Sequence, residues 1–165
     1  MFNSKVKISI IVSMFNSDIT EKLLEGTFSR LIKSGIDKNQ VDIIKVPGAI
    51  EIPLTAKFLA MSKKYQAIIC LGAVIRGETD HYDYVCQQVS QGCQQVMLEF
   101  NIPVIFGILT THNLQQAQDR VCQSKYHKGI EAAEAAISMI KLTNTLTALA
   151  IIPNPIVDKN TTPYQ

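Results

Sequence analysis

The sequence predicts an α/β fold, a three-layer sandwich in which helices cover both faces of a four-stranded parallel sheet. Short, mostly apolar runs alternate along the chain with longer segments whose apolar residues recur every three or four positions, as they do in helices. Nearly continuous apolar runs are typical of strands buried on both sides, and strand–helix alternation favours right-handed crossovers between parallel strands. At 165 residues the chain is expected to form one domain over residues 1–165.

Each element is predicted from its local pattern. Strands are expected at Val6–Ser13, Val41–Val46, Ala67–Ile75 and Val104–Leu109. Helices are expected at Ile19–Ser34, at Ile50–Lys63, after Asp80, after Asn113 and after Gly129. Gly35 is expected to end the first helix, Pro53 fits only near the start of the second, and Asn113 suits a helix N-cap. Residues 153–165 show no periodicity and are expected to fray.

Helical spacing also predicts which side chains of the second and third helices are buried. For the second helix they are Leu54, Phe58, Leu59 and Met61. For the third they are Val85, Val89, Cys93, Val96, Met97 and Phe100. Helices packed in this way on both faces of the sheet make the predicted architecture flavodoxin-like.

The composition excludes several classes of function. Sixteen basic and 14 acidic residues are mixed along the chain and give a net charge of +2, so neither nucleic acid nor an anionic membrane is expected as a partner. No apolar stretch approaches the roughly 20 residues that span a bilayer. The cysteines show no metal-ligand spacing and lie in apolar periodic segments, which indicates free, mostly buried thiols and a cytoplasmic location. They are Cys70, Cys86, Cys93 and Cys122.

Polar or glycine-containing segments follow all four predicted strands. They are Met14–Asn16, Gly48–Glu51, Arg76–His81 and Thr110–His112. In an open parallel sheet, ligands bind in the crevice beyond the carboxyl ends of the strands. The sequence therefore predicts a ligand site built from these four segments.

The segment after the third strand indicates an anion site. Gly77, Glu78 and Thr79 would present backbone N–H groups at the positive end of a helix dipole, with Arg76 as a neighbouring charge. An ordinary helix N-cap by Thr79 or Asp80 is the alternative. Neither a P-loop nor a G-x-G-x-x-G fingerprint occurs in the sequence, so no nucleotide is indicated.

His81 lies in the first turn of the same helix, where a neutral imidazole could transfer protons near pH 7. A solvated or capping histidine is the alternative. Cys86 comes five positions later, off the helix face of His81, so no Cys–His nucleophilic pair is expected. Asp80, His81 and Asp83 splay around one turn, so no metal site is expected either.

Three further residues each have two interpretations. Glu51 could bind the hydroxyls of a polyol, or merely complement the dipole of its helix. Phe15 could stack on a flat heterocycle, or simply close the core. Arg120, on the polar face of the helix after the fourth strand, could serve an anionic substrate across a subunit boundary, or remain a solvated surface charge.

Five segments together resemble the lumazine synthase family. They are Phe15-Asn16, VPGAIEIP (46–53), LGAVIRGETDHYDYV (71–85), PVIFGILTT (103–111) and KGIEAA (128–133). The resemblance implies a transferase of riboflavin biosynthesis that needs no cofactor and no metal. It would condense 5-amino-6-(ribitylamino)pyrimidinedione with 3,4-dihydroxy-2-butanone 4-phosphate to 6,7-dimethyl-8-ribityllumazine, releasing phosphate and water.

The resemblance also implies a role for each site residue. Those around the pyrimidine and its ribityl chain are Phe15, Ala49, Ile50, Glu51, Ala73, Val74 and Ile75. Gly77, Glu78 and Thr79 would cradle the phosphate, and His81 would transfer protons. A neighbouring subunit would supply Phe106, Arg120 and Lys128, with Arg120 pairing with the phosphate.

The sequence departs from the family pattern at three places. Met14 stands where arginine is common, Ile50 where an aromatic residue is common, and residues 122–127 replace a glycine-rich G-T-K-x-G-N turn. Shared sites imply a homo-oligomer, and we favour a pentamer or a decamer over a sixty-subunit shell, with riboflavin synthase as a candidate partner. The Ile50 departure leaves open a non-catalytic flavin- or pteridine-binding protein on the same fold, whereas His81 and Arg120 favour the enzyme.

Overall fold

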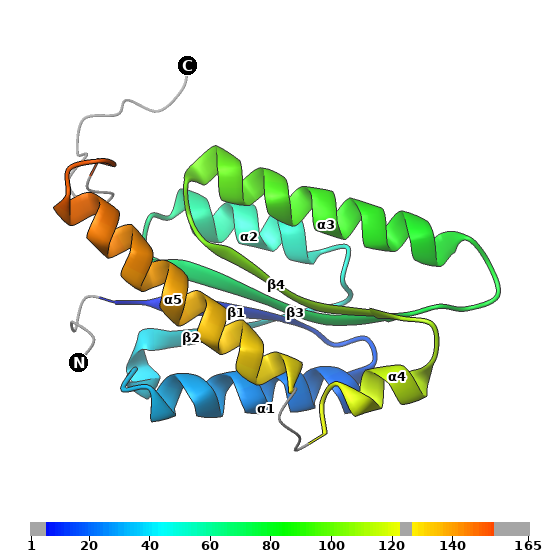
Figure 1. Cartoon of the computed structure of the whole chain (residues 1–165). Coiled ribbons are helices and arrows are strands. Elements are labelled where there is room, and N and C mark those ends of the chain that lie inside the picture. Colours follow the sequence, from blue (N-terminus) through cyan, green and yellow to red (C-terminus); the bar gives the residue numbers. More distant parts are fainter. Residues whose placement is uncertain (1–5, 123–126, 154–165) are drawn as a thin grey trace.

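The computed structural model describes residues 6–122 and 127–153, and it confirms the predicted fold (Figure 1). The strands are β1 (Ile8–Ser13), β2 (Val41–Val46), β3 (Ala67–Ile75) and β4 (Val104–Thr111). The helices are α1 (Ser17–Lys33), α2 (Ile52–Met61), α3 (His81–Phe100), α4 (Leu114–Asp119) and α5 (Lys128–Ala148), and a 3₁₀ turn, η1 (Lys38–Gln40), precedes β2. Two strands have the predicted bounds, β1 begins two residues later than expected, and β4 ends two residues later.

All four strands are parallel and lie in the order β2-β1-β3-β4. Ile10 of β1 pairs with Ile43 of β2 and with Ile69 of β3, which in turn pairs with Ile105 of β4. The two central strands, β1 and β3, are thus paired on both sides, and every residue of β1 is buried. The carboxyl ends of the four strands consequently share one edge of the sheet.

Side chains that alternate along the strands fill two cores, one on each face of the sheet. Ile10 and Leu71 pack toward α1 and α5, in the same core as Ile137. Ile11 and Cys70 pack toward α2 and α3 on the opposite face. Figure 1 shows the resulting layers, with α2 and α3 on one side of the sheet and α1, α4 and α5 on the other.

Three predicted helix ends are confirmed. Gly35, at φ +88°, follows α1, and the N–H of Ile36 donates to the carbonyl of Leu31 (3.2 Å), which completes a Schellman motif. Pro53 lies in the first turn of α2. Asn113 Oδ1 accepts a hydrogen bond (2.9 Å) from a backbone N–H in the first turn of α4.

The predicted buried face of α2 is wrong for three of its four residues, whereas Leu59 is half-buried and packs against the core. Leu54, Phe58 and Met61 are 58%, 62% and 57% exposed, and the side chains that α2 buries are those of Ile52, Ala56 and Ala60. Both sets recur at helical spacing, so the pattern alone does not choose between them. The structure selects the face with small residues, because they let the helix backbone approach its neighbours closely. Exposed large apolar side chains at this density are typical of an interaction surface.

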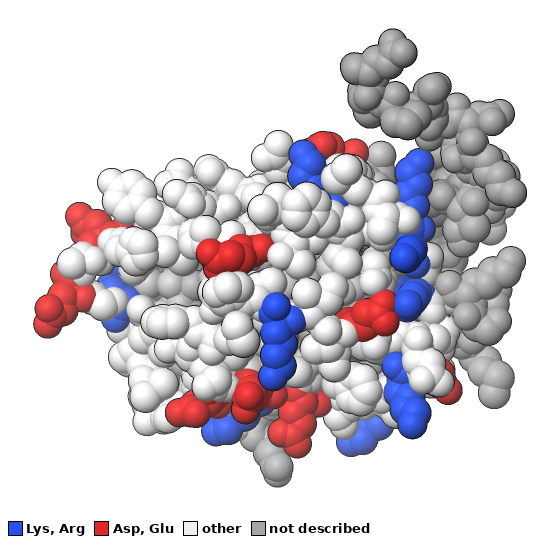
Figure 2. Space-filling view, turned by 180° about the vertical axis from the view of Figure 1, so that it is seen from behind, with Lys and Arg blue, Asp and Glu red and all other residues white. Residues whose placement is uncertain are grey.

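The predicted buried face of α3 is confirmed, with Val89 and Cys93 buried. All four cysteines are free, as predicted, although Cys122 is exposed. Charged side chains of both signs are spread over the face seen in Figure 2, with large uncharged areas between them. Within the described part of the chain, no helix is long and apolar enough to cross a bilayer. Two predicted features lie outside the described residues. They are residues 123–126, in the segment that replaces the glycine-rich turn of the family, and the predicted frayed tail from residue 154 onward.

The closest approach of α2 and α3 depends on Gly92. A Cβ added at Gly92 would lie 2.6 Å from Pro53 Cβ and 2.8 Å from Pro53 Cγ. Gly92→Ala is expected to lower the free energy of unfolding by about 1–2 kcal/mol, since overpacking a rigid ring against a helix outweighs the better helix propensity of alanine. Urea unfolding measures this loss. Gln91→Ala, at an exposed position of the same helix, is the control, and equal stability of the two variants would contradict the prediction.

Candidate active site

Three hydrogen bonds join the loop after β1 to the carboxyl ends of β2 and β3, and the residues that they join form the floor of the candidate site. The N–H of Met14 donates to the carbonyl of Val46 (2.8 Å), and the N–H of Phe15 donates to the carbonyl of Pro47 (3.1 Å). Asn16 Nδ2 donates to the carbonyl of Ala73 (2.8 Å). The structure therefore brings the segment predicted after β1 against the carboxyl ends of β2 and β3.

Apolar side chains are exposed at this floor. Phe15 is 70% exposed and Ile50 is 40% exposed, so Phe15 does not close the core and its ring is free to stack on a ligand. Ala49 and Ala73 are buried, and Val74 and Ile75 are half-buried. With Met14, which is 52% exposed, the floor thus presents three exposed apolar side chains.

Two residues of the floor were not predicted as site residues. Asn16 adopts a left-handed conformation (φ +57°), which asparagine tolerates better than most residues, and its side chain links β1 to β3. Ser13 Oγ is buried at the end of β1 and has no hydrogen-bond partner among the described residues. The asparagine after Phe15 was the available sequence signal, whereas nothing in the pattern marks Ser13.

Glu51 closes the turn between β2 and α2. Its Oε2 accepts a hydrogen bond from the N–H of Gly48 (2.8 Å), and Glu51 itself stands at the N-cap position of α2. The side chain of Glu51 is exposed, as is that of its neighbour Ile50. The observed hydrogen bond serves the turn before α2, and the exposed carboxylate can also accept hydrogen bonds from the hydroxyls of a ligand.

The loop from Gly77 to Asp80 is exposed, and α3 begins directly after it at His81. Asp80 stands at the N-cap position without a side-chain capping hydrogen bond, and Thr79 Oγ1 lies 3.4 Å from the N–H of His81. The predicted cap is therefore weak, and the first turn of α3 offers N–H groups to an anion. The His81 side chain is exposed beside this turn.

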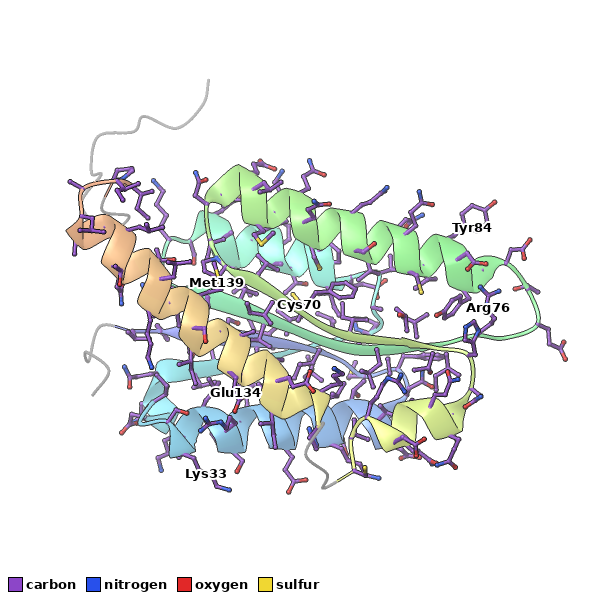
Figure 3. The ribbon with its side chains drawn as sticks, in the orientation of Figure 1. Lys33, Cys70, Arg76, Tyr84, Glu134 and Met139 are labelled. Atoms are coloured by element: carbon purple, nitrogen blue, oxygen red, sulfur yellow. The ribbon has the colours of Figure 1, made fainter. Side chains whose placement is uncertain are left out.

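Arg76 is held against the first turn of α3 (Figure 3). Its Nη2 forms an ion pair with Asp83, and its guanidinium lies 4.4 Å from the centre of the Tyr82 ring. Its Nε is buried with no hydrogen-bond partner in the described part of the chain. The predicted neighbouring charge is present, and it is paired with Asp83.

Burial raises the pKa of Tyr82 and the pKa of Cys86, which lie one helical turn apart on α3. A raised thiol pKa disfavours the thiolate, which is the nucleophilic form of cysteine. Cys86 is therefore unsuited to a nucleophilic role, in agreement with its predicted position off the face of His81. No group of three or more His, Cys, Asp or Glu side chains that could hold a metal ion occurs among the described residues.

The three residues predicted to serve a neighbouring subunit lie together, in a different place. They line a pocket of about 400 Å³ between β4, one of the two edge strands, and the start of α5, which we call the edge pocket. The three residues are Phe106, Arg120 and Lys128. Neither His81 nor any predicted residue from the ends of β1, β2 and β3 lines the edge pocket. The structure thus separates the predicted site residues into two groups on one chain.

Both cations of the edge pocket have partners within the chain. Arg120 is the C-cap residue of α4, which ends at Asp119, one residue before it. Its side chain is exposed, as predicted for the polar face, whereas Ala117 and Val121 are buried. Arg120 Nη1 donates to the carbonyl of Gln116 (2.8 Å). Lys128 Nζ forms an ion pair with Glu131 (2.6 Å), and the Lys128 N–H donates to the carbonyl of Arg120 (2.9 Å).

Fold and site together define a class of protein, a parallel α/β sandwich with aromatic and polar side chains exposed at the strand ends and a separate pocket with two cations beside the edge strand β4. Residues 5–144 match the family described as 6,7-dimethyl-8-ribityllumazine synthase. The chain is 58% identical over 142 residues to the 6,7-dimethyl-8-ribityllumazine synthase of Coxiella burnetii (strain RSA 493 / Nine Mile phase I), covering 86% of this chain and 94% of that protein. It is 48% identical over 158 residues to the protein of the same name from Protochlamydia amoebophila (strain UWE25), covering 96% and 92%. The chain belongs to the 6,7-dimethyl-8-ribityllumazine synthase family.

Proposed function

We propose that the strand-end crevice is where this chain acts as a lumazine synthase, a transferase of riboflavin biosynthesis. The substrates are 5-amino-6-(ribitylamino)pyrimidinedione and 3,4-dihydroxy-2-butanone 4-phosphate. The observation that carries the proposal is the presence, on a chain of this family, of exposed Phe15, Glu51 and His81 side chains at the strand ends, beside a weakly capped helix N-terminus. A pocket with two cations lies apart from them, beside the edge strand β4.

In the crevice, Phe15 stacks on the pyrimidine, and Glu51, with the backbone of Ala49 and Ile50, binds the ribityl hydroxyls. Backbone groups of Ala73, Val74 and Ile75 meet the pyrimidine edge. Gly77, Glu78 and Thr79 present N–H groups and a hydroxyl to the phosphate. The exposed Phe15 ring and the weakly capped first turn of α3 support these roles.

The reaction depends more on holding the two substrates in position than on activating either of them. The amine of the pyrimidine attacks the ketone carbonyl, which gives an imine and water; phosphate is then eliminated, and the second nitrogen closes the ring with loss of another water. His81 moves protons between these atoms, and fixed N–H donors stabilise the charge on the departing phosphate. Holding amine and ketone together removes much of the entropic barrier.

A second subunit completes each site in this proposal. Its Phe106, Arg120 and Lys128 close the crevice from outside, with Arg120 on the phosphate. The separation of these residues from His81 on one chain and the exposed apolar face of α2 support a ring, for which we propose a pentamer, alone or paired into a decamer. We place the enzyme in the cytoplasm, where riboflavin synthase would consume its product.

Two measurements on one sample test the function. The purified chain is mixed with both substrates, and lumazine is followed by its absorbance and fluorescence against an enzyme-free mixture. Light scattering then gives the mass, expected at five or ten times the 18.3 kDa of the chain. A rate equal to the enzyme-free mixture would overturn the enzymatic function, and riboflavin binding without turnover would favour a flavin-binding protein. An active monomer would overturn the shared site.

A further inference from the structure

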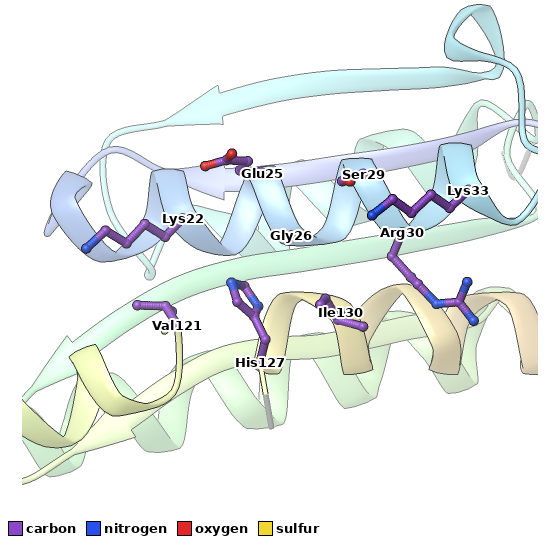
Figure 4. A pocket seen from close by; sticks show the side chains of 9 residues that line it. All are labelled: Lys22, Glu25, Gly26, Ser29, Arg30, Lys33, Val121, His127 and Ile130. Carbon is purple, nitrogen blue, oxygen red and sulfur yellow. The ribbon is translucent and has the colours of Figure 1, made fainter. Parts of the chain in front are cut away.

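A close junction between α1 and α5 lies outside both parts of the proposed site. The imidazole of His127, the N-cap residue of α5, is 7% exposed and seated over Gly26 of α1 (Figure 4). A Cβ added at Gly26 would lie 2.3 Å from His127 Cε1 and 2.7 Å from Nδ1. The ring occupies this place only because residue 26 is glycine.

The first turn of α5 is equally close to α1. A Cβ added at Gly129 would lie 2.3 Å from the carbonyl oxygen of Leu23. The buried hydroxyl of Thr27 is 2.8 Å from the carbonyl oxygen of Leu23 and 2.9 Å from that of Gly129, and so bridges the two helices. Two glycines and one hydroxyl therefore fix how the start of α5 rests on α1.

His127 also caps its own helix. Its Nδ1 accepts a hydrogen bond from the N–H of Gly129 (3.1 Å), which requires a neutral ring with the proton on Nε2. Burial lowers the pKa of His127 and so favours this neutral form, with Glu25 acting in the opposite direction.

The other side of the ring borders a cavity of about 530 Å³ between α1 and the start of α5. The charged side chains that line this cavity all come from α1, and they are Lys22, Glu25, Arg30 and Lys33 (Figure 4). Arg30 Nε is paired with Glu134 of α5 (3.0 Å). The cap is thus formed between a mixed-charge cavity and the backbone of α1.

The junction is directly connected to the edge pocket. Lys128 follows His127, and its N–H donates to the carbonyl of Arg120 (2.9 Å). Glu131, the ion-pair partner of Lys128, donates its N–H to the carbonyl of His127 (3.1 Å). A shift of the first turn of α5 would therefore move Lys128, Glu131 and the backbone of Arg120 together.

We propose that His127, seated over Gly26 and capping α5, is a positioning residue that holds Lys128 and Arg120 in place for the phosphate of the substrate. The inference rests on the proposed function, because it assigns the edge pocket to the phosphate-bearing substrate. Oriented charges bind an oxyanion well only when their supports are fixed to within fractions of an ångström.

Kinetics of four variants test this role. His127→Ala is expected to raise KM for 3,4-dihydroxy-2-butanone 4-phosphate about five- to tenfold, the size of a lost N-cap, with KM for the pyrimidine and kcat within about twofold. His127→Asn is expected to restore KM, because its amide oxygen can accept from the N–H of Gly129. Gly26→Ala is expected to raise the same KM, because the methyl group displaces the imidazole ring. The double variant Gly26→Ala/His127→Asn is expected to recover the wild-type KM, because the shorter asparagine side chain leaves room for the methyl group. Ser29→Ala, which lines the same cavity, is the control.

Binding of inorganic phosphate, measured by calorimetry on the same variants, gives a readout independent of turnover. The affinity is expected to follow the KM pattern. Equal rises in both KM values, an unchanged KM in His127→Ala, or no recovery in His127→Asn and in the double variant would overturn the positioning role. If His127→Ala does not fold, Gly26→Ala and the double variant decide. A wild-type protein that binds phosphate but makes no lumazine would overturn the proposed function instead, and the affinities would still test the junction.

Discussion

Replacing His81 with alanine is expected to slow turnover about 10- to 100-fold while leaving the KM of both substrates within about twofold. Proton transfer by a positioned side chain typically accelerates a reaction at least about 100-fold. The acceleration by His81 is expected at or below that value, because both substrates are already reactive. The His81 side chain is exposed at the start of α3, beside the weakly capped turn, so its removal disturbs no buried contact. Steady-state kinetics with each substrate varied in turn measures the effect.

A matched control makes the His81 result specific. Gln88→Ala, at an exposed position two turns further along α3, is expected to be fully active. Turnover that survives the substitution unchanged would show that solvent moves the protons and that His81 is only a surface residue.

Arg120→Ala is expected to reduce kcat/KM for the phosphate-bearing substrate about 10- to 100-fold, the range for a lost hydrogen bond to a charged group. KM for the pyrimidine is expected to change by less than about threefold, because that substrate carries no phosphate. Arg120→Lys keeps the charge but loses the bidentate geometry, so an intermediate loss is expected. Separate KM values for the two substrates measure this difference.

The Arg120 result needs a stability control, because its Nη1 also donates to the carbonyl of Gln116 at the end of α4. Thermal unfolding of both variants shows whether α4 is intact. Lys22→Ala, which removes an exposed cation on α1, is expected to leave both KM values unchanged. Equal losses for the two substrates in a folded Arg120→Ala protein would contradict the assignment of Arg120 to the phosphate.

Local patterns predict the strands well because breakers flank them. Val41–Val46 has the predicted bounds because Pro47 and Gly48 stop it, and Ala67–Ile75 is one long apolar run. The same reasoning fails on α2, where large residues and small ones occupy different faces at the same spacing. Periodicity reports that a helix has an apolar face, but only the packing of the whole chain decides which face lies inward.

The site shows the same limit. Parallel strands end at one edge of the sheet, so the loops that contain Phe15, Glu51 and His81 could be predicted to meet from the order of elements alone. The ion pair of Arg76 with Asp83 and the seating of His127 over Gly26 could not, because each depends on the three-dimensional course of the backbone. The second of these contacts joins residues about a hundred positions apart, and no local pattern encodes it.

The internal partners of Arg120 and Lys128 have a consequence for selectivity. An anion that enters the edge pocket would compete with a backbone carbonyl for Arg120 and with a carboxylate for Lys128. A singly charged guest such as chloride or acetate offers no more than the contacts it would break. A phosphate monoester carries nearly two charges on three oxygens and offers more to both cations at once. Under the proposed function, these internal partners would therefore favour the phosphate-bearing substrate over singly charged anions at this pocket.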